Sequence, residues 1–212
     1  MSDSHPIIYE PTTTITDFLI FFLGCYYSWF LIKITGSVFH LFWGFSFFIL
    51  SIGALLGGIS HGFGPKLSEL VKIVIWKSTL FFVGLAALVI FFSVVLVFTN
   101  GSINFLMLLL LVFVFIFFLY NVFKHDSFLG VVKFYLPILI VSSVCFLYIF
   151  VFKGYTGALF IFVGILVTLA ASLIQTSKIA IHKHFNHNDF FHVLQMISMY
   201  LMYEGGLEMP KI

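Results

Sequence analysis

The sequence predicts an all-α membrane protein, a bundle of seven transmembrane helices. Hydrophobic residues make up 62% of the 212 residues, and charged residues only 8%. A soluble domain carries about 25% charged residues, so this chain cannot cover a water-facing surface. Long apolar segments also alternate with short polar breaks along the whole chain. The net charge of +2 is too small to indicate a nucleic-acid partner.

The predicted spans follow from the length of the apolar segments. A helix needs about 20 apolar residues to cross a bilayer, and short breaks rich in Gly, Asn, Lys and His separate the segments. We predict helices at 15–34, 37–60, 71–98, 103–123, 129–152, 155–180 and 189–206. Together they form one seven-helix transmembrane domain, 15–206, between the short tails 1–14 and 207–212.

The lysines predict the orientation of the bundle. Seven spans place the termini on opposite faces, and cytoplasmic loops carry an excess of Lys. The N-terminal side carries most of these residues: Lys66, Lys72, Lys77, Lys124, Lys133, Lys178 and Lys183. The opposite side carries Lys33, Lys153 and Lys211. We therefore expect a cytoplasmic N-terminus and an external C-terminus, in a plasma (inner) membrane.

Two histidines from distant segments are expected to meet near the cytoplasmic face. His61 closes the second segment in the stretch GGISHGFG, and His192 lies early in the seventh, in HNDFFHVLQ. The predicted topology puts both at one face and at similar depth. Ionisable groups inside a membrane are costly and mark functional sites. Imidazole suits zinc, and a catalytic zinc keeps three protein ligands and one open position. We expect Zn²⁺ here.

The third ligand has two candidates. Asp189 lies three residues before His192, on the same helical face. His187 lies five residues before His192 and converges with it only if the helix begins after His187. Asn186 and Asn188 are good N-cap residues, which would allow that start. His187 and Asp189 therefore both remain metal-ligand candidates, and Asp189 is also a candidate orienting group or general base.

Simpler interpretations exist for the same residues. Asp189 would be a first-turn acid favoured by the helix dipole. His61 would be an interfacial histidine bonded to a backbone group. His182, His184 and His187 would belong to a solvated loop beside the lipid headgroups. Asp17, in TITDFLI, is most simply a helix-start residue, and its alternative role is a second catalytic candidate, as the proton acceptor or a supporting group.

The stretches around His61 and His192 resemble the CREST superfamily, which includes alkaline ceramidases, progestin and adiponectin receptors, and haemolysin III proteins. The resemblance rests on GGISHGFG and on NDFFHVLQMISMYLMYEG. It implies seven helices and a zinc held by a histidine late in the second helix and a His-x-x-x-His pair early in the seventh. It also implies, for many members, hydrolysis of lipid amides. His61 and His192 match two of those three histidines.

The chain departs from the superfamily pattern at three places. The first histidine of the pair falls on Asn188, which His187 and Asp189 flank. The superfamily serine falls on Gly57, with Ser60 as the nearest hydroxyl. The third segment has no aspartate. The fold and a metal site therefore transfer more directly than the substrate.

Two functions are expected. The first is a metal-dependent hydrolase of a lipid amide or ester, in which the metal lowers the pKa of a bound water toward about 7 and Asp189 or Asp17 accepts the proton. The alternative is a non-catalytic receptor or binding protein with a structural metal. In both cases the partner is a membrane lipid. A transporter would place its polar groups near the midplane, whereas this cluster lies near one surface.

Overall fold

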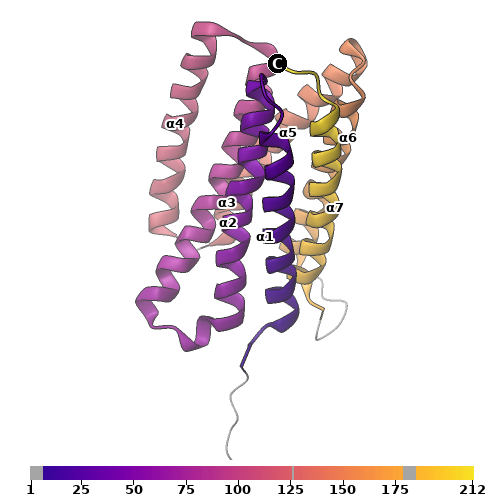
Figure 1. Cartoon of the computed structure of the whole chain (residues 1–212). Coiled ribbons are helices and arrows are strands. Elements are labelled where there is room, and N and C mark those ends of the chain that lie inside the picture. Colours follow the sequence, from indigo (N-terminus) through magenta and orange to yellow (C-terminus); the bar gives the residue numbers. More distant parts are fainter. Residues whose placement is uncertain (1–6, 126, 179–184) are drawn as a thin grey trace, which may run out of the picture.

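The computed structural model describes residues 7–125, 127–178 and 185–212, and each of the seven predicted segments is a helix (Figure 1). The predicted boundaries are correct to within a few residues. The helices are α1 Pro11–Ile32, α2 Val38–Phe63, α3 Glu69–Phe98, α4 Gly101–Lys124, α5 Phe128–Lys153, α6 Thr156–Ser177 and α7 His187–Glu208; a short 3-10 helix, η1 Gly64–Lys66, follows α2.

Local sequence signals place several helix ends. α1 begins at Pro11 rather than near residue 15, because the fixed φ of proline suits the first turn of a helix. Ser37 caps α2, with its side chain accepting a hydrogen bond from the backbone N–H of His40. α5 ends at Gly154, whose left-handed φ of 71° is open to glycine without strain.

Six helices of the described part of the chain, α1 to α6, are long and apolar enough to cross a membrane. The protein is therefore an integral, multi-pass membrane protein. α7 is a helix of 22 residues but is less apolar than the others. α7 carries more polar side chains than the others, and four of them are buried inside the bundle: Asp189, His192, Gln195 and Ser198.

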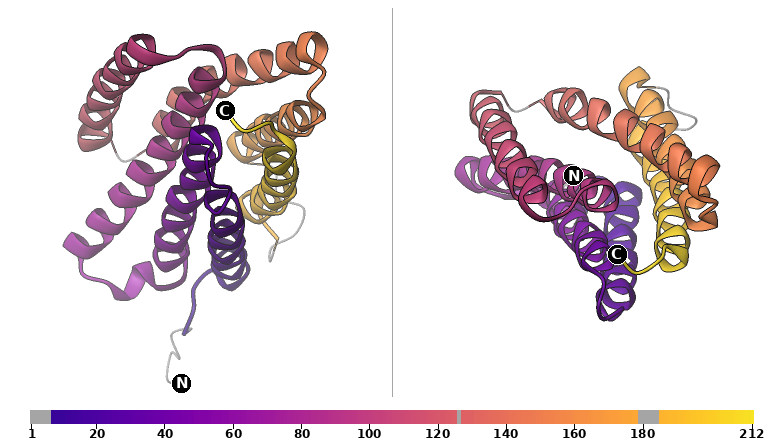
Figure 2. Two further views of the ribbon diagram at one scale, coloured as in Figure 1. Left: turned by 45° about the horizontal axis from the view of Figure 1, so that its top comes forward. Right: turned by 90° about the horizontal axis from the view of Figure 1, so that it is seen from above.

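Six helices form a closed ring in the order α1, α2, α3, α5, α6, α7, with α7 returning to contact α1 (Figure 2). α4 lies outside this ring and packs mainly on α3. Within α4 only Phe118 and Val122 are buried. The other faces of α4 are apolar and exposed, as expected for a helix surrounded by lipid.

Contacts along α7 show how it runs beside its two neighbours. α7 is antiparallel to α6, because Gly157 meets Gly205 at one end and Gln175 donates to Asn188 Oδ1 at the other. α7 is parallel to α1. Thr13 bonds Asp189 near the start of both helices, and the rings of Tyr27 and Tyr203 stack 4.4 Å apart further along. α7 therefore extends over the same depth as α6.

Candidate functional site

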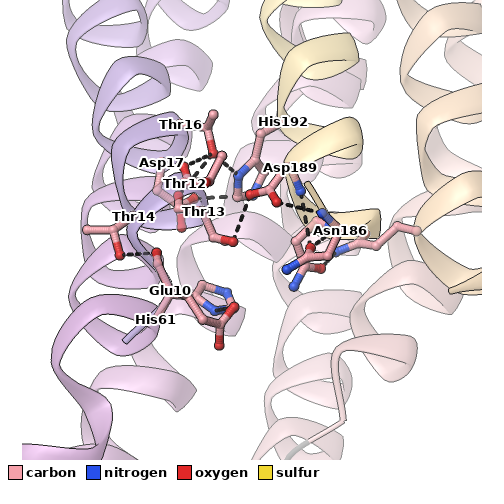
Figure 3. A network of polar contacts seen from close by, with 12 residues as sticks. Glu10, Thr12, Thr13, Thr14, Thr16, Asp17, His61, Asn186, Asp189 and His192 are labelled. Carbon is pink, nitrogen blue, oxygen red and sulfur yellow. Dashed lines mark hydrogen bonds and ion pairs between the residues drawn. The ribbon is translucent and has the colours of Figure 1, made fainter. Parts of the chain in front are cut away.

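A polar network, part of it buried, joins the start of α1, the end of α2 and the start of α7 at one end of the bundle (Figure 3). Its members are Glu10, Thr13, Thr16, Asp17, His61, Asn186, Asp189 and His192. Three helices of the ring supply these residues, together with Glu10 and Asn186, the residues that directly precede α1 and α7. The network therefore depends on the closure of α7 against α1.

His192 is held by α1 through both ring nitrogens. Its Nδ1 lies 2.8 Å from Thr16 Oγ1, and its Nε2 lies 3.3 Å from Asp17 Oδ1. The Thr16 hydroxyl donates to the backbone oxygens of Thr12 and Thr13. Since a hydroxyl carries one proton, its oxygen accepts a hydrogen bond from Nδ1–H of His192. Nε2 is therefore the nitrogen of His192 that faces the acid.

Asp17 lies well inside α1, which begins at Pro11, so its simpler interpretation as a helix-start residue is wrong. Its side chain is buried, and Oδ2 has no hydrogen-bond partner within the described residues. A Cβ at Gly57 would lie 3.4 Å from each carboxylate oxygen, in van der Waals contact, so Gly57 on α2 lies directly beside the carboxylate. A buried oxygen without a partner is costly, which makes Oδ2 a candidate to bind a ligand.

Asp189 forms a capping box at the start of α7. Its Oδ2 accepts the backbone N–H of Asn186 at 2.7 Å, and the Asn186 side chain accepts the N–H of Asn188 at 2.7 Å. Its Oδ1 accepts a hydrogen bond of 2.8 Å from the Thr13 hydroxyl. The simpler interpretation as a first-turn acid is therefore confirmed for Asp189. These contacts fix the carboxylate between α1 and α7.

His61 lies in the last turn of α2, where its Nδ1 is 3.2 Å from Glu10 Oε2. Its partner is thus a carboxylate and not a backbone group. The imidazole also lies edge-on to the indole of Trp76, with ring centroids 6.5 Å apart. The hydrogen bond from His61 lowers the pKa of Glu10, which lies before the first span.

An elongated cavity of about 210 Å³ extends from this network into the bundle. Asp17, His61 and His192 line it at the network end. Its α7 wall runs from Asn188 to Met202, which is about 21 Å along a helix. The remaining lining is mostly apolar, including Leu50, Val83, Ile90, Leu139 and Met199. The residues that line it come from all six helices of the ring and from none of α4.

One of the other predicted histidines, His187, does not line the cavity. His187 is the first residue of α7 and is half-buried. His182 and His184 lie outside the described residues. The structure therefore brings together His61, His192 and Asp17 around one cavity. Asp189 is held in the cap of α7, and neither Asp189 nor His187 lines the cavity.

The side chains of this site are of types that bind metals, but they do not converge on one point. Within residues 7–125, 127–178 and 185–212, no three His, Cys, Asp or Glu side chains converge closely enough to hold a metal ion. The donor set does suit one. His61 and His192 each have Nδ1 held by another side chain, as metal-binding histidines commonly do. Asp17 adds a carboxylate oxygen without a partner.

Sequence reasoning missed the supporting residues of the network. Glu10, Thr13 and Thr16 were not predicted, although they precede or share a helix with Asp17. A signal was available in EPTTTITD, since Thr13 lies three residues before Thr16 and four before Asp17. Those spacings place all three side chains on one helical face.

Comparison with known proteins places the chain within one family. No curated protein and no solved structure matches it. A family model matches residues 12–211, which include α2 to α7, nearly all of α1 and every member of the network except Glu10. The chain therefore belongs to a family of unknown function, DUF6962.

Proposed function

We propose that this protein binds an amphiphile inside the membrane, with the polar head at Asp17, His61 and His192. The observation that carries the proposal is the cavity, which is ionisable at one end and mostly apolar over the rest of its length. A lipid chain would lie along the apolar part, between α2, α3 and α7. A pocket with a few polar groups at one end and an apolar lining suits such a ligand.

We also propose that α7 is a seventh span. Support comes from its contacts with α6 from end to end, since α6 is itself long and apolar enough to cross the bilayer. Its polar residues face the bundle interior, where a membrane protein tolerates them. The network end would then face the cytoplasm of a plasma (inner) membrane, as the lysine distribution favours. Reporter fusions at the two termini test this: they should report opposite faces, and the same face would contradict seven spans.

The chemistry proposed for the site is hydrolysis of a lipid amide or ester with the help of a metal, zinc first. His61, His192 and Asp17 would hold it, a set that replaces the predicted His187 and Asp189. Bound zinc supplies an activated water at neutral pH. The resemblance to the CREST superfamily and the Nδ1 partners of both histidines support this proposal.

The chain's own residues have separate parts in this proposal. Thr16 and Glu10 orient the imidazoles of His192 and His61. Asp17 would hold the metal through Oδ2, which has no partner within the described residues, and its other oxygen, Oδ1, would accept the proton. Asp189 acts indirectly, by fixing the start of α7 against Thr13.

The second candidate is a receptor or binding protein without turnover. In this function a metal at the site would be structural. Gly57 leaves no hydroxyl at the position of the superfamily serine, and this observation favours it. The same cavity and the same amphiphile would serve this function, so a binding measurement alone cannot separate the two.

Metal content and turnover together separate them. Purified wild type from zinc-replete cells should hold about one zinc per chain, and His61→Ala and His192→Ala should lose it. His125→Ala is the control, because His125 is exposed at the end of α4. Wild type without metal would overturn the zinc proposal. Zinc without turnover of a membrane lipid extract would favour the receptor. Turnover that Asp17→Asn abolishes would establish the hydrolase.

A further inference from the structure

A second pocket lies outside the ring of helices, between α4 and the start of α5, and we call it the α4–α5 groove. Its volume is about 450 Å³, and none of the residues that line it lines the cavity beside Asp17, His61 and His192. The groove exists because α4 lies outside the ring and packs mainly on α3 (Figure 2), so the start of α5 is left partly uncovered. It is therefore a separate site, and what it binds does not depend on the proposed function.

Apolar side chains form most of the α4–α5 groove. Among those that line it, Phe118, Val122 and Val131 are buried, whereas Phe117 and Leu129 are exposed by 68% and 48%. In a membrane protein, an exposed apolar surface of this kind meets lipid chains. A volume of about 450 Å³ also lies within the range of ligand pockets. The groove is thus large enough to hold part of an acyl chain.

Polar side chains line the groove where α4 ends and α5 begins, among them Asn121, Ser127 and Lys133. Because α2 ends at the polar network and successive helices alternate in direction, α4 ends and α5 begins toward that same face of the bundle. The lysine distribution favours the cytoplasmic side for this face. Anionic lipids give that side of a membrane its negative surface potential.

Lys133 is the cation that the groove leaves without a protein partner. It is exposed five residues beyond the first residue of α5, about 7.5 Å into the helix. Two nearby lysines are engaged with α4: Lys77 Nζ donates to the backbone oxygen of Phe123 at 2.7 Å, and Lys124 Nζ lies 4.5 Å from the ring centroid of Tyr120.

The charge of Lys133 has no counterpart in the protein. Within the described part of the chain, Lys133 makes no hydrogen bond, ion pair or cation–π contact, and no described residue that lines the groove is acidic. A charge on a membrane span is costly unless it is paired or reaches the surface. The side chain leans toward the start of α5, at the level of the lipid headgroups. Its partner is therefore expected from the lipid.

We propose that the α4–α5 groove binds an anionic phospholipid, with the phosphate at Lys133 and an acyl chain beside Phe117 and Leu129. Ser127 caps no backbone N–H with its side chain, so its hydroxyl is placed to donate a second hydrogen bond to the phosphate. Basic pockets between membrane helices bind anionic head groups in this way. A zwitterionic lipid would bring a cation toward the lysine, so the anionic lipid is preferred.

Two lipids with identical chains test the charge preference. Native mass spectrometry of the purified protein in detergent measures the dissociation constant of the first bound lipid, for dioleoyl phosphatidylglycerol and for dioleoyl phosphatidylcholine. Wild type should bind phosphatidylglycerol about fivefold more tightly, the effect of one lysine near a membrane surface. In Lys133→Gln the two lipids should bind equally, with the affinity for phosphatidylcholine unchanged. Equal affinities in wild type, or a preference that survives Lys133→Gln, would overturn the proposal.

Two further variants separate this site from the general charge of the protein. Lys153→Gln is the matched control, because Lys153 is exposed at the other end of α5, over the ring of Phe98, and should keep the preference. Gly130 lines the groove, and nothing lies within 4 Å of a Cβ added there. Gly130→Phe should fill the groove and lose the tight phosphatidylglycerol site. A preference lost in Lys153→Gln, or unchanged binding in Gly130→Phe, would contradict a site in this groove.

Discussion

Asp17 Oδ1 lies 3.3 Å from His192 Nε2, and this contact joins the first helix of the chain to the last. Both side chains are buried, and both line the cavity. Neither residue has a partner of this kind within its own helix. The contact of α1 with α7 closes the ring of helices, and the same contact brings Asp17 beside His192.

The Asp17–His192 contact should be measurable as a coupling energy. In a double-mutant cycle with Asp17→Ala and His192→Ala, we expect a coupling of about 0.5–3 kcal/mol in the free energy of unfolding, because the two groups are in direct contact. Thermal unfolding in detergent measures it. The pair Asp17→Ala and His125→Ala is the control and should be additive. Additive effects of the first pair would contradict the contact.

The capping box of α7 predicts the effect of changes at Asn186. Asn186→Ala should lower the free energy of unfolding by about 1 kcal/mol, because the backbone N–H groups of Asn188 and Asp189 lose their acceptor. Asn186→Ser keeps an acceptor and should remain close to wild type. Chemical or thermal unfolding in detergent distinguishes the two. A serine variant as unstable as the alanine variant would show that the cap is not the cause.

The contact between Glu10 and His61 should make stability depend on pH in one direction. His61 lowers the pKa of Glu10. A carboxyl with a lowered folded pKa stabilises the fold fully above its unfolded pKa, and this stabilisation is lost as the pH falls through the folded value. Wild type should therefore unfold at a higher temperature than Glu10→Gln at neutral pH, and the two should converge in acid. A difference that grows in acid would contradict this assignment.

The packing of α6 on α7 predicts opposite effects for two glycine substitutions. A Cβ at Gly205 would lie 2.5 Å from the backbone oxygen of Gly157 and 2.8 Å from the backbone nitrogen of Ile161, so Gly205→Ala should destabilise by about 1–3 kcal/mol. Gly130, within α5, has nothing within 4 Å of such a Cβ. Gly130→Ala should be neutral or slightly stabilising. Equal melting temperatures for both variants would contradict the close approach of α6 and α7.

Several features of the protein follow from its sequence alone. Apolar length and spacing predict each of the seven helices, because a membrane helix satisfies its own backbone and needs no distant partner. The sequence also identified His61, His192 and Asp17 as candidates, since ionisable side chains stand out within apolar segments. These predictions depend only on local composition and on the spacing of apolar segments along the sequence.

The tertiary structure decided how those residues combine. Asp189 and His187 were the candidates closest to His192 in sequence, yet one completes a helix cap and the other lies outside the cavity. The carboxylate beside His192 comes instead from Asp17 on α1. Helical periodicity relates residues on one helix but says nothing of which helix packs beside it. That choice depends on the closing contact of α1 with α7.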